Sequence, residues 1–163
     1  MEAVKNHRKR PAGVLSLVCF VVGVVGMGWG LGLLTGPDAW YANLAKPWFT
    51  PPNSVFAPVW TALYVMIAVA GWRVWRLVVD RLPFGLWILQ MVLNGVWSPL
   101  FFLAHQPGMA LFIITLLLVT VLFFIIRTQK HDRVAAGLFI PYAIWTGIAT
   151  VLNAAIYGLN QAG

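Results

Sequence analysis

Residues 83–127, PFGLWILQMVLNGVWSPLFFLAHQPGMALFIITLLLVTVLFFIIR, decide the fold of this chain. The stretch holds no Asp, Glu or Lys, and its one Arg is the last residue. A helix crosses a hydrocarbon core of about 30 Å with about 20 apolar residues, so the stretch is about two spans long. Pro107 and Gly108 are strong helix breakers near its middle. The sequence therefore predicts two membrane-spanning helices, 83–104 and 108–127.

Three further apolar runs flank this pair, at 12–34, 54–76 and 134–158. Hydrophobic residues make up 61% of the chain and charged residues only 9%, against about 25% charged in soluble domains. The apolar runs are continuous rather than alternating, which excludes a membrane β-barrel. We expect an all-α bundle of five transmembrane helices in one membrane domain, 12–163, after a basic cytoplasmic tail, 1–11.

Lys and Arg are distributed unevenly between the connecting segments. The tail before the first span has four, the second and fourth loops have three each, and the first loop has only Lys46. Ten of the eleven basic residues thus lie on one side, which predicts a cytoplasmic N-terminus and an external C-terminus. Short basic clusters between apolar runs are topology signals, so no nucleic-acid partner is expected. The lipid bilayer is the expected environment, in a bacterial cell membrane.

The first loop, 35–53, is the only long connection, and it is rich in proline and aromatic residues. Proline reduces the conformational freedom of the open chain, and the aromatic side chains need a surface to pack on. Loops of this length in a small domain are usually functional. We expect loop 35–53 to be an ordered lid over the outer mouth of the bundle.

Aromatic and amide side chains share helix faces deep in three spans. Trp60 and Tyr64 are one helical turn apart, and the other two groups follow three- and four-residue spacing. Amides at this depth cannot face lipid cheaply and must point into the bundle. Interhelical hydrogen bonding would account for one such amide, whereas the full set predicts an aromatic cavity for a flat, largely apolar ligand. The second and third groups are Trp87, Gln90, Asn94 and Trp97, and Tyr142, Trp145, Ala149 and Asn153.

Charged residues are missing from the central part of every predicted span. Coupled carriers nearly always need one there, and no metal-ligand spacing or paired carboxylate is present. We expect no catalytic residue, no metal site and no cofactor. Residues 111–126, without Trp, amide or charge, are expected to face lipid or a second copy. The glycine spacing of 26–32 favours close helix contact and leaves a homodimer open.

The chain resembles the tryptophan-rich sensory protein family, the TspO/translocator protein group that includes the mitochondrial peripheral-type benzodiazepine receptor. The resemblance rests on WYANLAKPWFTPP at 40–52, PVWTALY at 58–64, Gln90-x-x-x-Asn94-x-x-Trp97, and Pro141-Tyr-x-x-Trp145-x-x-x-Ala149. It implies a five-helix bundle with a ligand pocket under the first loop. The pocket positions that it implies are Tyr41, Trp60, Tyr64, Asn94, Trp97, Trp145 and Ala149. With the neighbouring Trp48, Gln90 and Asn153, these form the candidate ligand-binding set.

The resemblance also implies the ligand, a porphyrin or haem bound as ligand rather than as a resident cofactor. A receptor-like role in sensing, sequestering or regulating haem-pathway intermediates is the expected function. Light-dependent porphyrin degradation and passive porphyrin transport are the alternatives, since both would use the same pocket. The family also leaves an outer-membrane location open.

The alternation of basic loops makes a testable prediction of topology. A reporter fused after Gly163 should be accessible outside the cytoplasm, whereas one inserted within 129–132 should be cytoplasmic, because Lys and Arg are retained inside. Protease protection and cysteine labelling in intact cells would measure this. A C-terminal reporter found inside would overturn either the number of spans or the orientation.

Overall fold

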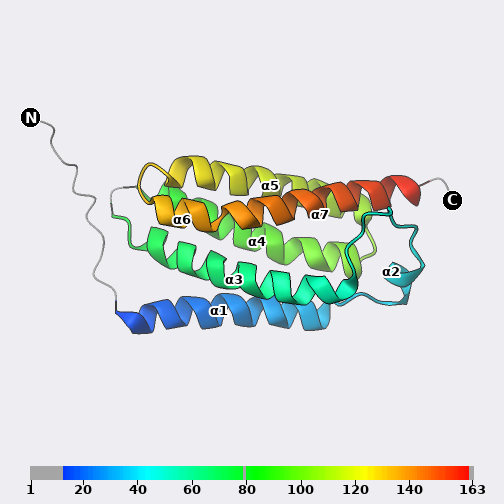
Figure 1. The fold of residues 1–163 in the computed structure, drawn as a ribbon, viewed down its shortest axis with the longest axis horizontal. Coiled ribbons are helices and arrows are strands. Elements are labelled where there is room, and N and C mark those ends of the chain that lie inside the picture. Colours follow the sequence, from blue (N-terminus) through cyan, green and yellow to red (C-terminus); the bar gives the residue numbers. More distant parts are fainter. Residues whose placement is uncertain (1–12, 79, 162–163) are drawn as a thin grey trace, which may run out of the picture.

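Five long apolar stretches form helices in the computed structural model, which describes residues 13–78 and 80–161. They are α1 (Val14–Leu34), α3 (Asn53–Trp75), α4 (Leu82–Phe102), α5 (Pro107–Thr128) and the consecutive pair α6 (Arg133–Leu138) and α7 (Ile140–Leu159). At about 1.5 Å per residue each spans about 30 Å, the thickness of a bilayer core. Figure 1 shows them side by side, with α1 beginning at the end of the bundle opposite to that where α7 ends. The all-α five-helix fold is confirmed, while the tail 1–11 lies outside the described residues.

The fifth span is interrupted one turn after it begins. Phe139 ends α6 and precedes α7, and Pro141 occupies the first turn of α7. Proline has no backbone N–H, and its ring collides with the carbonyl four residues earlier, here that of Gly137. The span predicted at 134–158 as one run is therefore two helices, which follow one another along the bundle (Figure 1).

Helix α5 packs against both α4 and α7 and supplies much of the core. Its ring of Phe124 stacks on Phe139, with centroids 3.9 Å apart. Residues 111–126 were expected to face lipid or a second copy, but only one side of this stretch is exposed. The other side is buried in the bundle, with its buried residues spaced four and three apart. The buried apolar side chains are Ala110, Ile114, Leu117, Val121 and Phe124.

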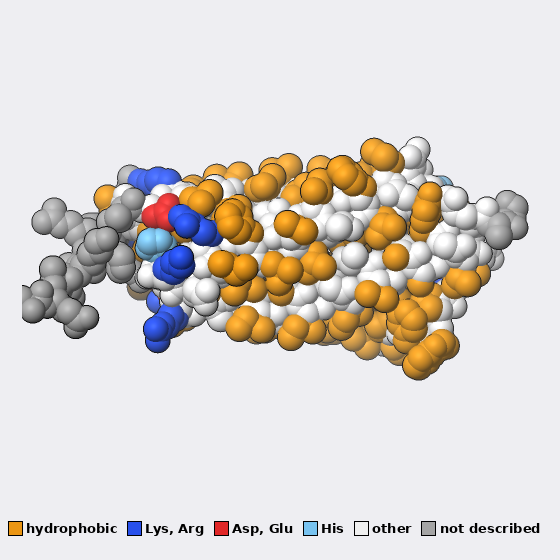
Figure 2. Space-filling model, turned by 90° about the horizontal axis from the view of Figure 1, so that it is seen from above, with side chains coloured by type: hydrophobic (Ala, Val, Ile, Leu, Met, Phe, Trp, Pro, Cys, Tyr) orange, Lys and Arg blue, Asp and Glu red, His pale blue; other side chains and the backbone are white. Residues whose placement is uncertain are grey.

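The two described basic clusters lie at one end of the bundle. Arg73, Arg76 and Arg81 surround the α3–α4 connection, and 127–133 form the α5–α6 connection at the same end. Figure 2 shows Lys and Arg side chains gathered there beside an apolar surface. Loop 35–53 lies at the opposite end (Figure 1) and includes the short helix α2 (Ala39–Asn43). The assignment of the basic end to the cytoplasm stays a prediction.

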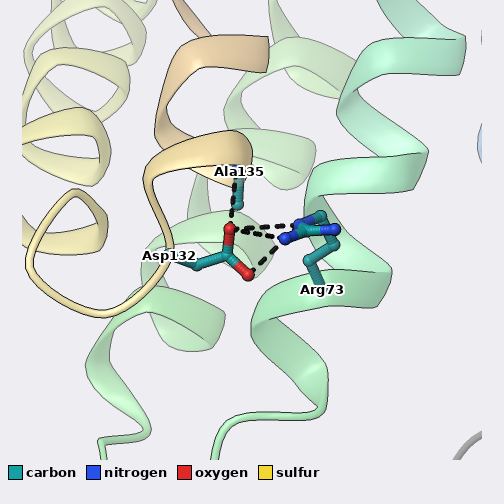
Figure 3. Close-up of polar contacts among 3 residues, drawn as sticks. All are labelled: Arg73, Asp132 and Ala135. Atoms are coloured by element: carbon teal, nitrogen blue, oxygen red, sulfur yellow. Dashed lines mark hydrogen bonds and ion pairs between the residues drawn. The ribbon is translucent and has the colours of Figure 1, made fainter. Parts of the chain in front are cut away.

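Asp132 joins α3 to the start of α6 at the basic end. Its carboxylate accepts from Nε and Nη2 of Arg73 on α3, at 3.1 and 2.9 Å, and from the backbone N–H of Ala135 at 3.0 Å (Figure 3). The Asp132 side chain is 1% exposed, and it caps the N-terminus of α6. A two-pronged guanidinium–carboxylate contact fixes geometry as well as charge. This contact sets where the broken fifth span lies against α3.

We predict that Arg73→Leu destabilises the protein by about 3 kcal/mol, because it removes the guanidinium from a buried carboxylate. Asp132→Asn should cost less, since asparagine still caps a helix and the exposed side of Arg73 can reach water. The double variant should therefore lose less than the sum of the two. Thermal unfolding in detergent would measure the series. Arg81→Leu, an exposed cation at the same end, should have little effect, and an equal loss there would contradict the prediction.

Candidate functional site

A cavity of about 620 Å³ lies between α1, α3 and α4, at the end of the bundle that carries loop 35–53. Loop residues Gly36, Pro37 and Tyr41 form its upper boundary. None of the lining residues within the described chain is charged. The helices contribute Gly28, Trp29, Leu31, Gly32 and Leu33 from α1, Asn53, Phe56, Ala57, Trp60, Thr61 and Tyr64 from α3, and Asn94, Trp97, Ser98 and Phe102 from α4.

Glycines on α1 shape one wall of the cavity. A Cβ on Gly28 would overlap the ring of Tyr64, so the glycine permits this close approach of α1 to α3. One turn further along, a Cβ on Gly32 would meet nothing within 4 Å. The same four-residue spacing therefore brings the helices together at Gly28 and leaves open space at Gly32.

Trp29 closes the side of the cavity where α1 faces α3. Its indole Nε1 donates to the hydroxyl of Thr61 at 3.2 Å, and that hydroxyl in turn donates to the carbonyl of Ala57 at 2.8 Å. The Trp29 side chain is 58% exposed although it lines the cavity. One ring thus separates the cavity from the surroundings of the bundle.

The opposite wall is aromatic. The ring of Trp60 stacks on Tyr64, with centroids 5.4 Å apart and planes 27° apart. Trp97 on α4 lies 6.5 Å from Trp60, tilted by 33°. Tyr142 of α7 supports Trp60 edge-on from behind, at 6.2 Å. Such flat faces can stack on a planar ligand, at about 1 kcal/mol per good contact beyond the area buried.

A chain of neutral hydrogen bonds fixes the inner end of the cavity. The Tyr64 hydroxyl donates to Oδ1 of Asn94 at 3.2 Å, and Nδ2 of Asn94 donates to the Tyr142 hydroxyl at 3.0 Å. Tyr64 and Asn94 line the cavity, whereas Tyr142 is fully buried. The three groups link α3, α4 and α7, so the orientation of the Asn94 amide is set by the bundle itself.

Hydroxyl groups join α1 to α4 near the lid. Thr35 donates to the carbonyl of Leu31 at 2.8 Å and is hydrogen-bonded to the hydroxyl of Ser98. Because the Thr35 proton is already used, Ser98 is the donor in that pair. Both side chains line the cavity, where they add polar groups to a mostly apolar surface.

Contacts at two points hold loop 35–53 against the ends of the helices. At one, the side chain of Asn160, the residue that follows α7, pairs with the backbone of Ala45, accepting its N–H at 3.1 Å and donating to its carbonyl at 3.0 Å. At the other, His105 of the α4–α5 turn stacks on Trp40 at 4.3 Å and contacts Asp38 at 3.1 Å. The ordered loop that the sequence indicated is therefore docked on the ends of α4, α5 and α7.

The short helix α2 packs the loop against the bundle. Asp38 caps α2 by accepting from the backbone N–H of Tyr41 at 2.9 Å. That N–H, and then His105, holds the pKa of Asp38 below its usual value. Tyr41 is buried against Phe101 and Phe102, and burial raises the pKa of its hydroxyl. Tyr41 thus stays neutral where it meets the cavity.

The structure brings together half of the candidate set derived from sequence. Tyr41, Trp60, Tyr64, Asn94 and Trp97 all line the cavity. The family resemblance implied all five, and the spacing of aromatic and amide side chains along the spans had separately selected the four on α3 and α4.

The other candidates lie outside the lining. Trp48 is 96% exposed at the tip of the loop. Asn153 accepts from Nε1 of Trp97 at 3.1 Å and donates to the carbonyl of Pro107 at 2.8 Å, so it holds the back of the aromatic wall. Ala149 is buried on α7. Trp145 packs edge-on to Phe56, which does line the cavity, at 5.6 Å.

Gln90 lies one turn further along α4 from Asn94, away from the cavity. It is 0% exposed, and neither of its amide atoms has a hydrogen-bond partner among the described residues. The three- and four-residue spacing correctly places Gln90 on the same face as Asn94. The cavity, however, ends at the Tyr64–Asn94 pair.

Sequence reasoning did not select the α1 side of the cavity. The glycine spacing that includes Gly28 and Gly32 had been explained by close helix contact, and Trp29 was not in the candidate set. A glycine at an open position leaves no polar or aromatic signal in the sequence. The one available signal was a tryptophan on the first span and a threonine on the second, Trp29 and Thr61, which could form a hydrogen bond. The sequence alone does not show that they are neighbours, because it does not fix the register of α1 against α3.

Comparisons with known proteins cover nearly the whole bundle. A model of the TspO/MBR family matches residues 17–158. The chain is 36% identical over 129 residues to the tryptophan-rich sensory protein of Cereibacter sphaeroides, covering 79% of this chain and 82% of the relative. It is 35% identical over 151 residues to the tryptophan-rich protein TspO of Archaeoglobus fulgidus, covering 90% and 98%. It is 33% identical over 151 residues to the translocator protein of Homo sapiens, covering 90% and 85%. These matches confirm the resemblance inferred from the motifs.

Proposed function

The chain belongs to the TspO/MBR family of multi-pass membrane proteins, and from that premise we propose that its cavity binds a porphyrin. The role proposed is receptor-like, in which the protein senses or sequesters a tetrapyrrole of the haem pathway within a bacterial cell membrane. The observation that carries the proposal is an uncharged cavity of about 620 Å³ with stacked aromatic rings on one wall and glycines on the other.

The size and lining of the cavity suit this class of ligand. Pockets for small organic ligands have volumes of about 300–1,000 Å³ and apolar walls with a few placed polar groups. Here the polar groups are the Asn94 amide and the Thr35 and Ser98 hydroxyls. A planar macrocycle would stack on Trp60 and Trp97, with its edge against the glycines of α1. Its carboxylates would then point to the mouth, where Gly36 and Asn53 are exposed.

A glycine substitution tests whether the ligand occupies this cavity. Gly32→Leu places a side chain in open space, so it should narrow the cavity without disturbing helix packing. We expect protoporphyrin binding in detergent, followed by the absorbance change of the porphyrin, to weaken by at least about tenfold, or about 1.4 kcal/mol.

Gly26→Leu is the matched control for that experiment. Gly26 lies on the same helix, a Cβ there also meets nothing within 4 Å, and it is not part of the cavity lining. It should bind protoporphyrin like the wild-type protein. Equal affinity in the wild-type and Gly32→Leu proteins would place the porphyrin elsewhere, and no binding by the wild-type protein would refute the proposed ligand.

The same model predicts similar binding of metal-free and iron porphyrins. The cavity lining contains no histidine or cysteine among the described residues, and His105 is engaged by Asp38 and Trp40 outside it. Stacking should therefore dominate, and titrations should give affinities for protoporphyrin and haem within about tenfold. A haem affinity about a hundredfold higher, abolished by His105→Ala, would replace stacking with axial ligation.

A further inference from the structure

A second cleft lies at the basic end of the bundle, far from the cavity under loop 35–53. It has a volume of about 470 Å³ and lies where the end of α5 meets α6 and the start of α7. Gln129, Lys130 and Arg133 supply its polar side, and Ile125 and Ile140 supply its apolar side. A cleft with a polar, basic wall and an apolar wall is complementary to a ligand that has both a charged group and an apolar group.

The two described acidic residues at this end, Asp80 and Asp132, already form ion pairs. Asp80 contacts Arg127 at 3.3 Å and His131 at 3.0 Å, and Asp132 pairs with Arg73 at 2.9 Å. No carboxylate in the described part of the chain forms an ion pair with either cation of the cleft, Lys130 or Arg133. Both cations are exposed. The cleft therefore presents positive charge that no carboxylate among residues 13–78 and 80–161 neutralises through an ion pair.

The position of the cleft relates this charge to the membrane. Ile125 belongs to the spanning helix α5, and Ile140 opens α7, so both lie where the apolar surface begins. Figure 2 shows Lys and Arg side chains at this end directly beside apolar side chains. A basic group next to apolar helix surface is the arrangement that holds a charged lipid headgroup.

We propose that this cleft is a binding site for an anionic phospholipid. The lipid phosphate accepts hydrogen bonds from the Lys130 ammonium, the Arg133 guanidinium and the Gln129 amide, and an acyl chain lies against Ile125 and Ile140. Two cations without an ion pair among the described residues favour a headgroup with net negative charge over a zwitterionic one, whose ammonium would find no partner in the cleft lining. The apolar walls disfavour a free anion, which could use only the polar side.

This inference is independent of the porphyrin proposal, since the two sites share no residue. Its sharpest test again uses a glycine. Gly137 lines the cleft, and a Cβ there would meet nothing within 4 Å. Gly137→Leu would fill the cleft without changing charge. Gly85→Leu is the matched control, because Gly85 is an exposed position near the start of α4, at the same end, with equal free space.

The experiment measures lipid retention by the purified full chain. Delipidated protein in detergent would be titrated with phosphatidylglycerol or phosphatidylcholine and examined by native mass spectrometry. We expect the wild-type protein to prefer phosphatidylglycerol by at least about tenfold. Gly137→Leu should lose that preference, and so should the double variant Lys130→Gln/Arg133→Gln. Gly85→Leu and Arg81→Gln, an exposed cation outside the cleft, should keep it.

Three results would overturn the proposal. One is equal retention of the two lipids by the wild-type protein, and another is an unchanged preference in both Gly137→Leu and the double variant. The third concerns the source of the anion. If inorganic phosphate displaced phosphatidylglycerol at an equal concentration, the site would be one for a free anion, because the apolar wall would then contribute nothing.

Discussion

Lipid offers no hydrogen-bond partner, and this constraint shapes both the fold and the cavity. Helices satisfy the backbone within each segment, so the polar side chains of the spans can find partners only inside the bundle. Asn94 joins the Tyr64 and Tyr142 hydroxyls, and Asn153 joins the Trp97 indole to the carbonyl of Pro107. These contacts stabilise the packing of α3, α4, α5 and α7. They also hold the aromatic wall rigid, so a planar ligand would meet a surface that is already ordered.

The cavity exists because α1 approaches the rest of the bundle unevenly. Gly28 lets the helix contact Tyr64, whereas Gly32, one turn nearer the loop, faces open space. Further along α1 in the other direction, Ser16 accepts from the Trp72 indole at 2.9 Å, and Phe20 packs on Trp87 at 5.6 Å. Close contact in one half of α1 and a gap in the other produce a pocket without a kink in the helix.

Much of this architecture is predictable from sequence because membrane thickness and charge asymmetry act on whole segments. The five spans and the ordered loop follow from long apolar runs and from the prolines of 35–53. Spacing also assigns Asn94 and Trp97 to one helix face. It does not say how far along that face a cavity extends, so Gln90 shares the face and yet lies beyond the Tyr64–Asn94 pair. Nor does it say which helices surround the cavity. Ala149 is buried on α7 as the spacing indicates, yet the lining comes from α1, the loop, α3 and α4. Those features depend on the packing of several helices at once.

The distribution of charge explains why the two ends of the molecule suit different ligands. The ion pairs among the described residues, such as Arg73–Asp132, lie at the ends of the bundle, because an ion within the hydrocarbon core is costly. At that end, surplus cations favour a charged headgroup. Nearer the middle of the membrane, shape, stacking and neutral hydrogen bonds are what remain for recognition. A cavity built from Trp60, Trp97 and glycines would therefore select a ligand by flatness and polarity, and any charge on the proposed ligand would lie at the mouth, beside the docked loop.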